Sequence, residues 1–341
     1  MPIFEYLIKG TRDNQTAATC ILRPNGFKEN INDPYDDRWC HAFLPTAERL
    51  AKEAQSFESV DKQRAISLYK RANAVYRISR FPYLDGTPLK RQAYEAQKAT
   101  YIRGASLWDV PIRDVSIRHP HAANGDGNQI PLYVRTPPNA SAQNKCGVML
   151  LITGLDGHRP DNSERSDEAL KRGWASVQCD IPGVADCPAN KRDPNSSDRL
   201  FSSLLEWIDT QPEFDSRKIV AWGLSAGGYY AIRLAHTHSD KLAGAVGHGA
   251  GTHHYIGKEW LAHADHHEYP FDLSRPYLSK YGYSSWEELL EKCQKEYSLV
   301  ENGIVNKKSC RLLLMNGVLD GCMPIEDSML LFEYGSPKEA R

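Results

Sequence analysis

The feature that most constrains this chain is the pentapeptide Gly-Leu-Ser-Ala-Gly at residues 223–227. The apolar residues 219–222 before it predict a short buried strand, and the apolar spacing after it predicts a helix. A Gly-x-Ser-x-Gly sequence between a strand and a helix is typical of a nucleophile elbow, a sharp turn that holds a serine in a strained backbone conformation. We therefore predict that Ser225 is a nucleophile, with an inert turn as the alternative.

Two backbone amides are candidates for an oxyanion hole. The helix after the elbow would direct the amide of Ala226 at the place where an oxyanion forms. A second donor is expected from the loop after the apolar residues 148–152, where Gly154 lets the backbone approach closely. We predict that the amides of Leu155 and Ala226 form the pair.

The chain is nearly neutral, with 42 basic and 43 acidic residues among 341, which argues against a nucleic-acid surface or a polybasic membrane patch. It has no apolar run of about 18 residues and no signal-peptide pattern at its start, so we expect neither a membrane span nor secretion. The eight cysteines contain no Cys-x-x-Cys pair, which favours reduced thiols. We expect a cytoplasmic protein with silent sequons at Asn139 and Asn195, and the sequence leaves association with vesicles open.

The pattern of the chain changes near residue 110. Before it, helix-forming residues and apolar spacing predict helices at 46–54, 61–79 and 88–108. After it, short apolar segments alternate with helical ones, which is typical of an α/β sheet with right-handed crossovers. The predicted strands lie at 114–118, 130–135, 148–152, 175–179, 219–222, 242–246 and 311–315, and the predicted helices of this part at 163–172, 198–209 and 324–334.

Together with the elbow, this order predicts an α/β-hydrolase fold with a mostly parallel sheet. Residues 1–110 would form a helical N-terminal cap or lid module. Residues 111–341 would form the catalytic domain, with a mostly helical insert at 253–302 after the sixth strand.

Asp320 is the candidate for the orienting acid. It follows the apolar residues 311–315 and comes about 95 residues after Ser225. In this fold the order along the chain is serine, acid, histidine, and an acid just past a strand end faces the crevice where ligands bind. We predict that Asp320 holds the catalytic histidine, with an ordinary turn aspartate as the alternative.

The catalytic histidine is missing from its expected place. No histidine follows Asp320, and the last one in the sequence is His267. We expect the natural protein to continue beyond Arg341 with the final strand and the loop that carries the histidine. The alternative is a displaced base drawn from four histidines, namely His158, His248, His253 and His254.

A group of histidines in the insert invites a metal site. Its spacing matches no familiar ligand motif, so we predict no metal ion and assign these side chains to solvent or to the lining of a pocket. His248 is different because it follows a sheet strand on the active-site side, where a contact with substrate and a structural role are both open. The group consists of His253, His254, His263, Asp265, His266 and His267.

Four segments together resemble one branch of the α/β-hydrolases. They read Ile-Thr-Gly-Leu-Asp-Gly at 152–157, Asp-Ile-Pro-Gly with Asp-Cys-Pro at 180–188, Gly-Leu-Ser-Ala-Gly-Gly at 223–228 and Asn-Gly-Val-Leu-Asp-Gly at 316–321. The chain is similar over nearly its whole length to the fungal polyketide-shortening hydrolases of melanin and conidial-pigment pathways, the yellowish-green pigment protein family. A bacterial relative of similar organisation cleaves a carbon–carbon bond in a nicotine metabolite.

The resemblance implies hydrolysis of a carbon–carbon bond in an aromatic polyketide. A naphthopyrone would be shortened to tetrahydroxynaphthalene, with release of an acetoacetyl-type fragment and without a cofactor. The helical module and the insert would close over the substrate, with contacts expected from Asp156, His158, Tyr229, His248 and His253. The absence of the histidine is the one departure from the family pattern.

Two other functions stay open at this point. The chain is also compatible with a carboxylesterase or peptidase on the same scaffold. A non-catalytic binding protein that lacks the base is the alternative from a different class. In each case the expected partner is a small molecule, and the helical module offers a surface for a homodimer.

Overall fold

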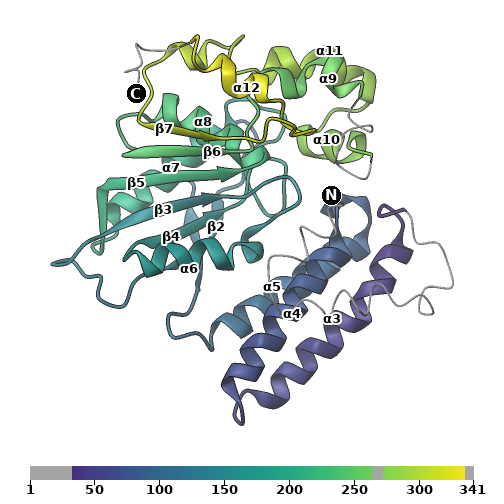
Figure 1. The fold of residues 1–341 in the computed structure, drawn as a ribbon, viewed down its shortest axis with the longest axis vertical. Helices are drawn as coiled ribbons and strands as arrows, with labels where there is room; N and C mark the ends of the chain where they lie inside the picture. The colour runs from purple at the N-terminus through teal and green to yellow at the C-terminus, as the bar shows by residue number, and fades with distance from the viewer. Residues whose placement is uncertain (1–32, 264–271, 335–341) are drawn as a thin grey trace. The chain divides into compact units, whose positions relative to one another are not determined.

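The computed structural model describes residues 33–263 and 272–334 of the chain (Figure 1). These residues form two compact units that divide between Pro111 and Ile112. Of the described residues, the helical unit takes 33–111 and Asp272, and the sheet unit takes 112–263 and 273–334. In these ranges no helix combines the length and the apolar character needed to cross a membrane.

Three helices make up most of the helical unit: α3 (Asp37–Phe57), α4 (Lys62–Arg80) and α5 (Pro88–Ala105). Each begins after a side chain that accepts a hydrogen bond from the first turn, which satisfies an amide that has no partner inside the helix. These capping side chains belong to Asp36, Asp61 and Thr87. The helices predicted at 61–79 and 88–108 are confirmed, with ends that differ by up to three residues.

The first helix is longer than predicted because it passes through Pro45. A proline inside a helix removes one backbone hydrogen bond and normally marks a boundary. In α3, however, Trp39, Phe43 and Ala47 recur at steps of four residues and are all buried. Burial of this stripe on both sides of Pro45 offsets the lost bond, so the predicted start at residue 46 was wrong.

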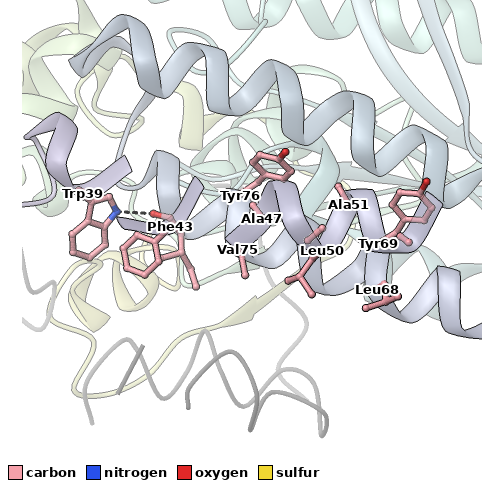
Figure 2. Packing of buried hydrophobic residues seen from close by; sticks show 12 residues of the cluster. Trp39, Phe43, Ala47, Leu50, Ala51, Leu68, Tyr69, Val75 and Tyr76 are labelled. Atoms are coloured by element: carbon pink, nitrogen blue, oxygen red, sulfur yellow. Dashed lines mark hydrogen bonds between the residues drawn. The ribbon is translucent and has the colours of Figure 1, made fainter. Parts of the chain in front are cut away.

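Figure 2 shows the apolar core between α3 and α4. Leu50 of α3 and Val75 of α4 are buried in it, and Trp39 donates its indole N–H to the carbonyl of Ile78 at 2.7 Å. The apolar stripe predicted in the second helix therefore packs between helices, as its spacing indicates.

The sheet unit contains one seven-stranded sheet in the order β1-β2-β4-β3-β5-β6-β7. The pairs β1–β2 and β2–β4 are antiparallel, and every pair from β4 to β7 is parallel. The predicted mostly parallel α/β-hydrolase sheet is confirmed. Its strands are β1 (Arg113–Arg118), β2 (Gln129–Arg135), β3 (Cys146–Ile152), β4 (Ala175–Cys179), β5 (Phe214–Leu224), β6 (Gly244–His248) and β7 (Leu312–Met315).

Helices lie on both faces of this sheet. On one face is α8 (Ala226–Thr237), because a Cβ added at Gly247 of β6 would lie 2.9 Å from the side chain of Ile232. On the other face is α6 (Ser163–Lys171), whose Arg165 guanidinium lies 5.3 Å from the ring centre of Trp222 on β5. The helix α7 (Ser196–Thr210) completes the alternation of strand and helix that the sequence predicts.

The face that carries Trp222 is bare near β7. Leu313 and Met315 pair in register with Val246 and His248 of β6, and they are 55% and 45% exposed. Among the described residues β7 pairs with β6 alone, so its second edge is free. One edge of the sheet and the adjoining face therefore lack cover in this part of the chain.

The predicted helical insert lies between β6 and β7. Its described elements are η3 (His254–Ile256), α9 (Lys258–Leu261), α10 (Ser274–Tyr281) and α11 (Trp286–Tyr297). Tyrosine rings pack the insert against α8, where Tyr229 lies 6.0 Å from Tyr255 between ring centres. After β7 follows α12 (Ile325–Leu330), which is shorter than the predicted 324–334 because the chain forms turns after it.

Lys280 of α10 places a buried amine in this packing. Its Nζ donates hydrogen bonds to the carbonyl of Pro182 at 3.0 Å and to the hydroxyl of Tyr230 at 2.9 Å. The same nitrogen lies over the rings of Tyr230 and Tyr281, 4.9 and 4.7 Å from their centres. Burial lowers the pKa of Lys280 to about 7, because the ammonium loses its hydration.

We expect Lys280→Met to change how the stability of the protein depends on pH. Between about pH 7 and the ordinary lysine pKa of about 10.4, the amine binds fewer protons in the folded protein than in the unfolded chain. The free energy of unfolding of the wild type should therefore rise with pH relative to the variant, by roughly 2 kcal/mol between about pH 7 and 9. Urea unfolding of both proteins across this range measures the difference.

The matched control is Lys171→Met. Lys171 is exposed, and its hydrogen bond to Glu168 raises the pKa of the amine, so its titration falls above this window. This variant should keep the pH profile of the wild type. Parallel profiles for the wild type and Lys280→Met would contradict the prediction.

Candidate active site

Ser225 lies at the tip of a sharp turn between β5 and α8. Its backbone has φ 56° and ψ −128°, a conformation that residues other than glycine rarely adopt. Its amide donates to the carbonyl of His248 at 2.8 Å, and its carbonyl accepts from the amide of Gly228 at 2.7 Å. The strand, the turn and the helix thus have the arrangement that defines a nucleophile elbow.

The two glycines of the pentapeptide are required by close backbone contacts. A Cβ at Gly223 would lie 2.0 Å from the carbonyl oxygen of Gly227, and a Cβ at Gly227 would lie 2.0 Å from that of Thr153. Neither neighbour is a flexible side chain that could move aside. The sequence Gly-x-Ser-x-Gly is therefore fixed here by the geometry of the turn.

The loop after β3 reaches the same turn. A Cβ at Gly154 would lie 3.1 Å from the carbonyl oxygen of Leu224 and 3.9 Å from Oγ of Ser225. The amide of Leu155 follows directly on this loop, and the amide of Ala226 belongs to the first residue of α8, where an N–H has no partner inside the helix. Both predicted oxyanion donors therefore lie on segments next to Ser225, and their role stays a prediction.

Asp320 lies on the loop that follows β7. Its Oδ1 accepts hydrogen bonds from the amides of Cys322 at 2.9 Å and Met323 at 2.8 Å. Its Oδ2 lies 3.6 Å from the position that a Cβ at Gly249 would take. The amide of Gly249 in turn donates to the carbonyl of Met315 at 2.7 Å. Asp320 is thus held beside the loop after β6, which directly follows His248, the last residue of β6, whose carbonyl accepts the amide of Ser225.

In the described part of the chain, no histidine nitrogen bonds to Ser225 Oγ or to the carboxylate of Asp320. The ring of His253 is already engaged, by the hydroxyl of Ser298 at 2.7 Å and more weakly by Gln294 at 3.4 Å. His158 is buried at the start of η2 (Arg159–Asp161), and His254 is exposed. None of these three histidines hydrogen-bonds to Ser225 Oγ in this conformation, and the displaced base stays a prediction.

Of the four candidate histidines, His248 contacts the elbow through its backbone, because its carbonyl accepts the amide of Ser225. Its ring is parallel to that of Trp222 within 9°, with 6.4 Å between ring centres. Its Nδ1 is buried and has no hydrogen-bond partner among the described residues. Burial, with a further contribution from Arg165, lowers the pKa of His248 and so favours the neutral ring. A contact with substrate and a structural role both remain open for it.

The remaining predicted site residues have different surroundings. Tyr229 is 2% exposed, and its hydroxyl donates to the carbonyl of Tyr297 at 2.8 Å, so in this conformation it packs the insert on α8. Asp156 is half-buried on the loop after β3. Contact of either side chain with substrate stays a prediction.

The histidine group of the insert lies only partly within the described residues. Asp265, His266 and His267 lie outside the described residues. Within the described ranges, no three side chains from histidine, cysteine, aspartate and glutamate come together as a metal ion would require.

Away from the elbow, the structure contains a group of a serine, a histidine and an aspartate in contact. His119 Nδ1 lies 2.7 Å from the hydroxyl of Ser203, and its Nε2 lies 3.9 Å from Asp126. The side chains of His119 and Asp126 are wholly inaccessible, and Ser203 is buried. No substrate can reach them, so this group is structural.

One carboxylate near the elbow was missed by the sequence analysis. Asp180 directly follows β4 and is buried, with Oδ2 2.8 Å from Arg159 Nε. Burial raises the pKa of Asp180, and the Arg159 guanidinium opposes the rise. A signal was present, because Asp180 stands just past a strand end in the same way as Asp320.

We expect the strain at Ser225 to be measurable as a difference between two variants. Ser225→Gly and Ser225→Ala both remove the hydroxyl, but only glycine adopts a positive φ without cost. The glycine variant should therefore have the larger free energy of unfolding, by about 1 kcal/mol, when both are unfolded in urea. Equal stabilities, or a more stable alanine variant, would show that the turn relaxes once the hydroxyl is gone.

The chain matches a family model described as "Esterase FrsA-like" over residues 37–338. The Esterase FrsA of Citrobacter koseri is 23% identical over 287 residues, which cover 83% of this chain and 66% of that protein. The Esterase FrsA of Escherichia fergusonii is 24% identical over 310 residues, covering 88% and 71%. The chain thus spans about two thirds of the length of these curated relatives.

Solved structures show the same fold. The 2,6-dihydroxy-pseudo-oxynicotine hydrolase has a TM-score of 0.74 and 18% identity, over 94% of this chain and 82% of its own. AbyA5 has a TM-score of 0.65 and 19% identity, over 85% and 78%. These likenesses establish the α/β-hydrolase fold, and the finer resemblance to fungal pigment hydrolases stays a prediction. Since the family model matches most of its length, the chain belongs to the FrsA-like esterase family.

Proposed function

We propose that this chain is a serine hydrolase in which Ser225 attacks the carbonyl carbon of its substrate. The observation that carries the proposal is the backbone of Ser225, at φ 56° and ψ −128° in the turn between β5 and α8. Such strain persists only where the surrounding structure imposes it, and at a strand-to-helix turn it presents the serine hydroxyl at the edge of the sheet. Membership of the FrsA-like esterase family supports the same class of reaction.

In the proposed mechanism a base takes the proton from Ser225 Oγ as the oxygen bonds to the carbonyl carbon. The electron pair of the carbonyl moves to its oxygen, which the amides of Leu155 and Ala226 would hold. Collapse of this intermediate restores the carbonyl and breaks the bond to the leaving group, which takes the proton from the base. Water then hydrolyses the acyl-serine and regenerates the hydroxyl.

We propose that the base is a histidine on a segment that follows Arg341 and pairs with β7. Two observations support this source. The free edge of β7 and the exposed side chains of Leu313 and Met315 offer a place for a further strand and for apolar cover. Oδ2 of Asp320 also makes no hydrogen bond among the described residues, so it can accept one from an imidazole. Within the 341 residues, His248 is the alternative base.

An ester is the first candidate substrate. The leaving group is then an alkoxide, and the family to which the chain belongs carries the description of an esterase.

An aromatic ketone is the second candidate, and the four segments quoted above favour it. In that case collapse breaks a carbon–carbon bond, and the ring carbon leaves as a carbanion that neighbouring oxygens delocalise. The polyketide-shortening reaction of pigment pathways is of this kind. A protein of the same fold is described as 2,6-dihydroxy-pseudo-oxynicotine hydrolase, and we take this as support for testing the second class of substrate.

We expect Ser225→Ala in the full natural protein to abolish turnover while leaving the protein folded. Loss of a nucleophile lowers kcat by at least about 10³-fold. The variant should also fail to react with a fluorophosphonate, which labels activated serines. Ser203→Ala is the matched control, because it removes the hydroxyl of the buried serine–histidine contact. Turnover by Ser225→Ala at the rate of the wild type would refute the mechanism.

The two substrate classes can be separated with a nitrophenyl ester and an acylated naphthopyrone. A carbon–carbon hydrolase should prefer the naphthopyrone in kcat/KM by orders of magnitude, and an esterase should show the reverse. The intact mass of the natural protein, compared with the 38.4 kDa of these residues, belongs to the same experiment. No turnover of either compound and no labelling would favour a binding protein.

A further inference from the structure

Both ends of the loop after β3 are hydrogen-bonded to one carboxylate, that of Asp180. At its start, the hydroxyl of Thr153 donates to Asp180 Oδ1 at 3.3 Å. At its end, the amide of Arg159 donates to the same oxygen at 3.1 Å, and Arg159 Nε donates to Oδ2 at 2.8 Å. Residues 154–158, which include the predicted oxyanion donor Leu155, therefore span two anchors on a single side chain.

These anchors are shielded from water. Asp180 is 4% exposed, Arg159 is 3% exposed and Thr153 is 1% exposed. Hydrogen bonds to an ionised group are stronger than those between neutral groups, and a low local dielectric strengthens them further. Arg159 is itself held on its outer side by Asp186, 2.6 Å from Nη2. The loop is thus fixed by a buried charge pair and not by exposed contacts that exchange with solvent.

The anchored loop is in direct contact with the elbow. Gly154 packs against Leu224 and Ser225, and the carbonyl of Thr153 packs against Gly227 at the start of α8. An error of a few tenths of an ångström in the loop would therefore change the space around Ser225 Oγ. A shift of the Leu155 amide by a similar amount would misalign it with the oxyanion, where donors act at about 2.7–3.1 Å.

We propose that Asp180 is a positioning residue for the reaction of Ser225. By binding both ends of the loop after β3, it holds the Leu155 amide where the oxyanion forms. This inference rests on the proposed function, since it assumes that an oxyanion forms at Ser225. Asp180 itself need not touch the substrate, so its contribution should be to the transition state and not to binding of the ground state.

The test compares Asp180→Asn with Asp126→Asn in the full natural protein. Asn keeps the size of Asp but loses the charge and turns one oxygen acceptor into a donor that faces Arg159. Asp126 is matched, because it is also buried, bonds to Arg199 and accepts the amides of Ala123 and Asn190, but it anchors a different turn. kcat, KM, the affinity for a boronic acid that mimics the tetrahedral intermediate and the fluorophosphonate labelling rate are measured for each variant.

We expect Asp180→Asn to lower kcat and the affinity for the boronic acid together, by about 10- to 100-fold, with KM unchanged. Asp126→Asn should keep the wild-type kcat, KM and affinity for the boronic acid. Where Asp180→Asn does not fold, Thr153→Val takes its place, because it removes one anchor and keeps the shape of the side chain. It should lower kcat several-fold at constant KM.

The outcomes separate this inference from the proposed function. Labelling of the wild type together with unchanged kcat and boronic-acid affinity in the folded variant would overturn the role of Asp180 alone. A rise in KM with kcat unchanged would also overturn it, since that pattern reports lost ground-state binding. A wild type that is not labelled, with full activity in Ser225→Ala, would overturn the proposed function and this inference with it.

Discussion

The close approach of backbone segments around Ser225 is the constraint on which the sheet unit depends. Gly223 and Gly227 bring the turn, the first residues of α8 and the loop after β3 into contacts that leave no room for a Cβ, and Gly154 makes a tight contact beside them. The amide of Ser225 adds a bond to the carbonyl of His248, which ties β5 to the end of β6. The positive φ at Ser225 is stable only because these contacts leave no other path for the chain.

Most of the fold could be predicted from the sequence, because it rests on local signals. A continuous apolar run predicts the central strand β3, and Asp61 marks the start of α4. The start of α3 was missed, since a proline signals a boundary locally while the buried stripe across Pro45 depends on a partner helix. Packing between elements decided that boundary, and a single stretch of sequence does not contain it.

The site was predicted less completely, for a similar reason. Motif and order along the chain single out Ser225 and Asp320, and their catalytic roles stay predictions. Asp180 also stands just past a strand end, but its link to the loop after β3 could not be predicted, because that link consists of hydrogen bonds to residues 21 and 27 positions earlier, at opposite ends of the loop. Tyr229 illustrates the converse. Its hydroxyl donates to the carbonyl of Tyr297 in the insert, a contact that the sequence does not reveal, and its contact with substrate stays a prediction.

The edge of β7 that has no partner strand among the described residues has a consequence for aggregation of the protein. An edge strand with exposed apolar side chains is a template on which a strand of another molecule can pair. Leu313 and Met315 of β7 are such side chains, and Leu319 on the following loop is 91% exposed. The colloidal stability of a preparation therefore depends on what covers β7, independently of whether the chemistry at Ser225 is intact.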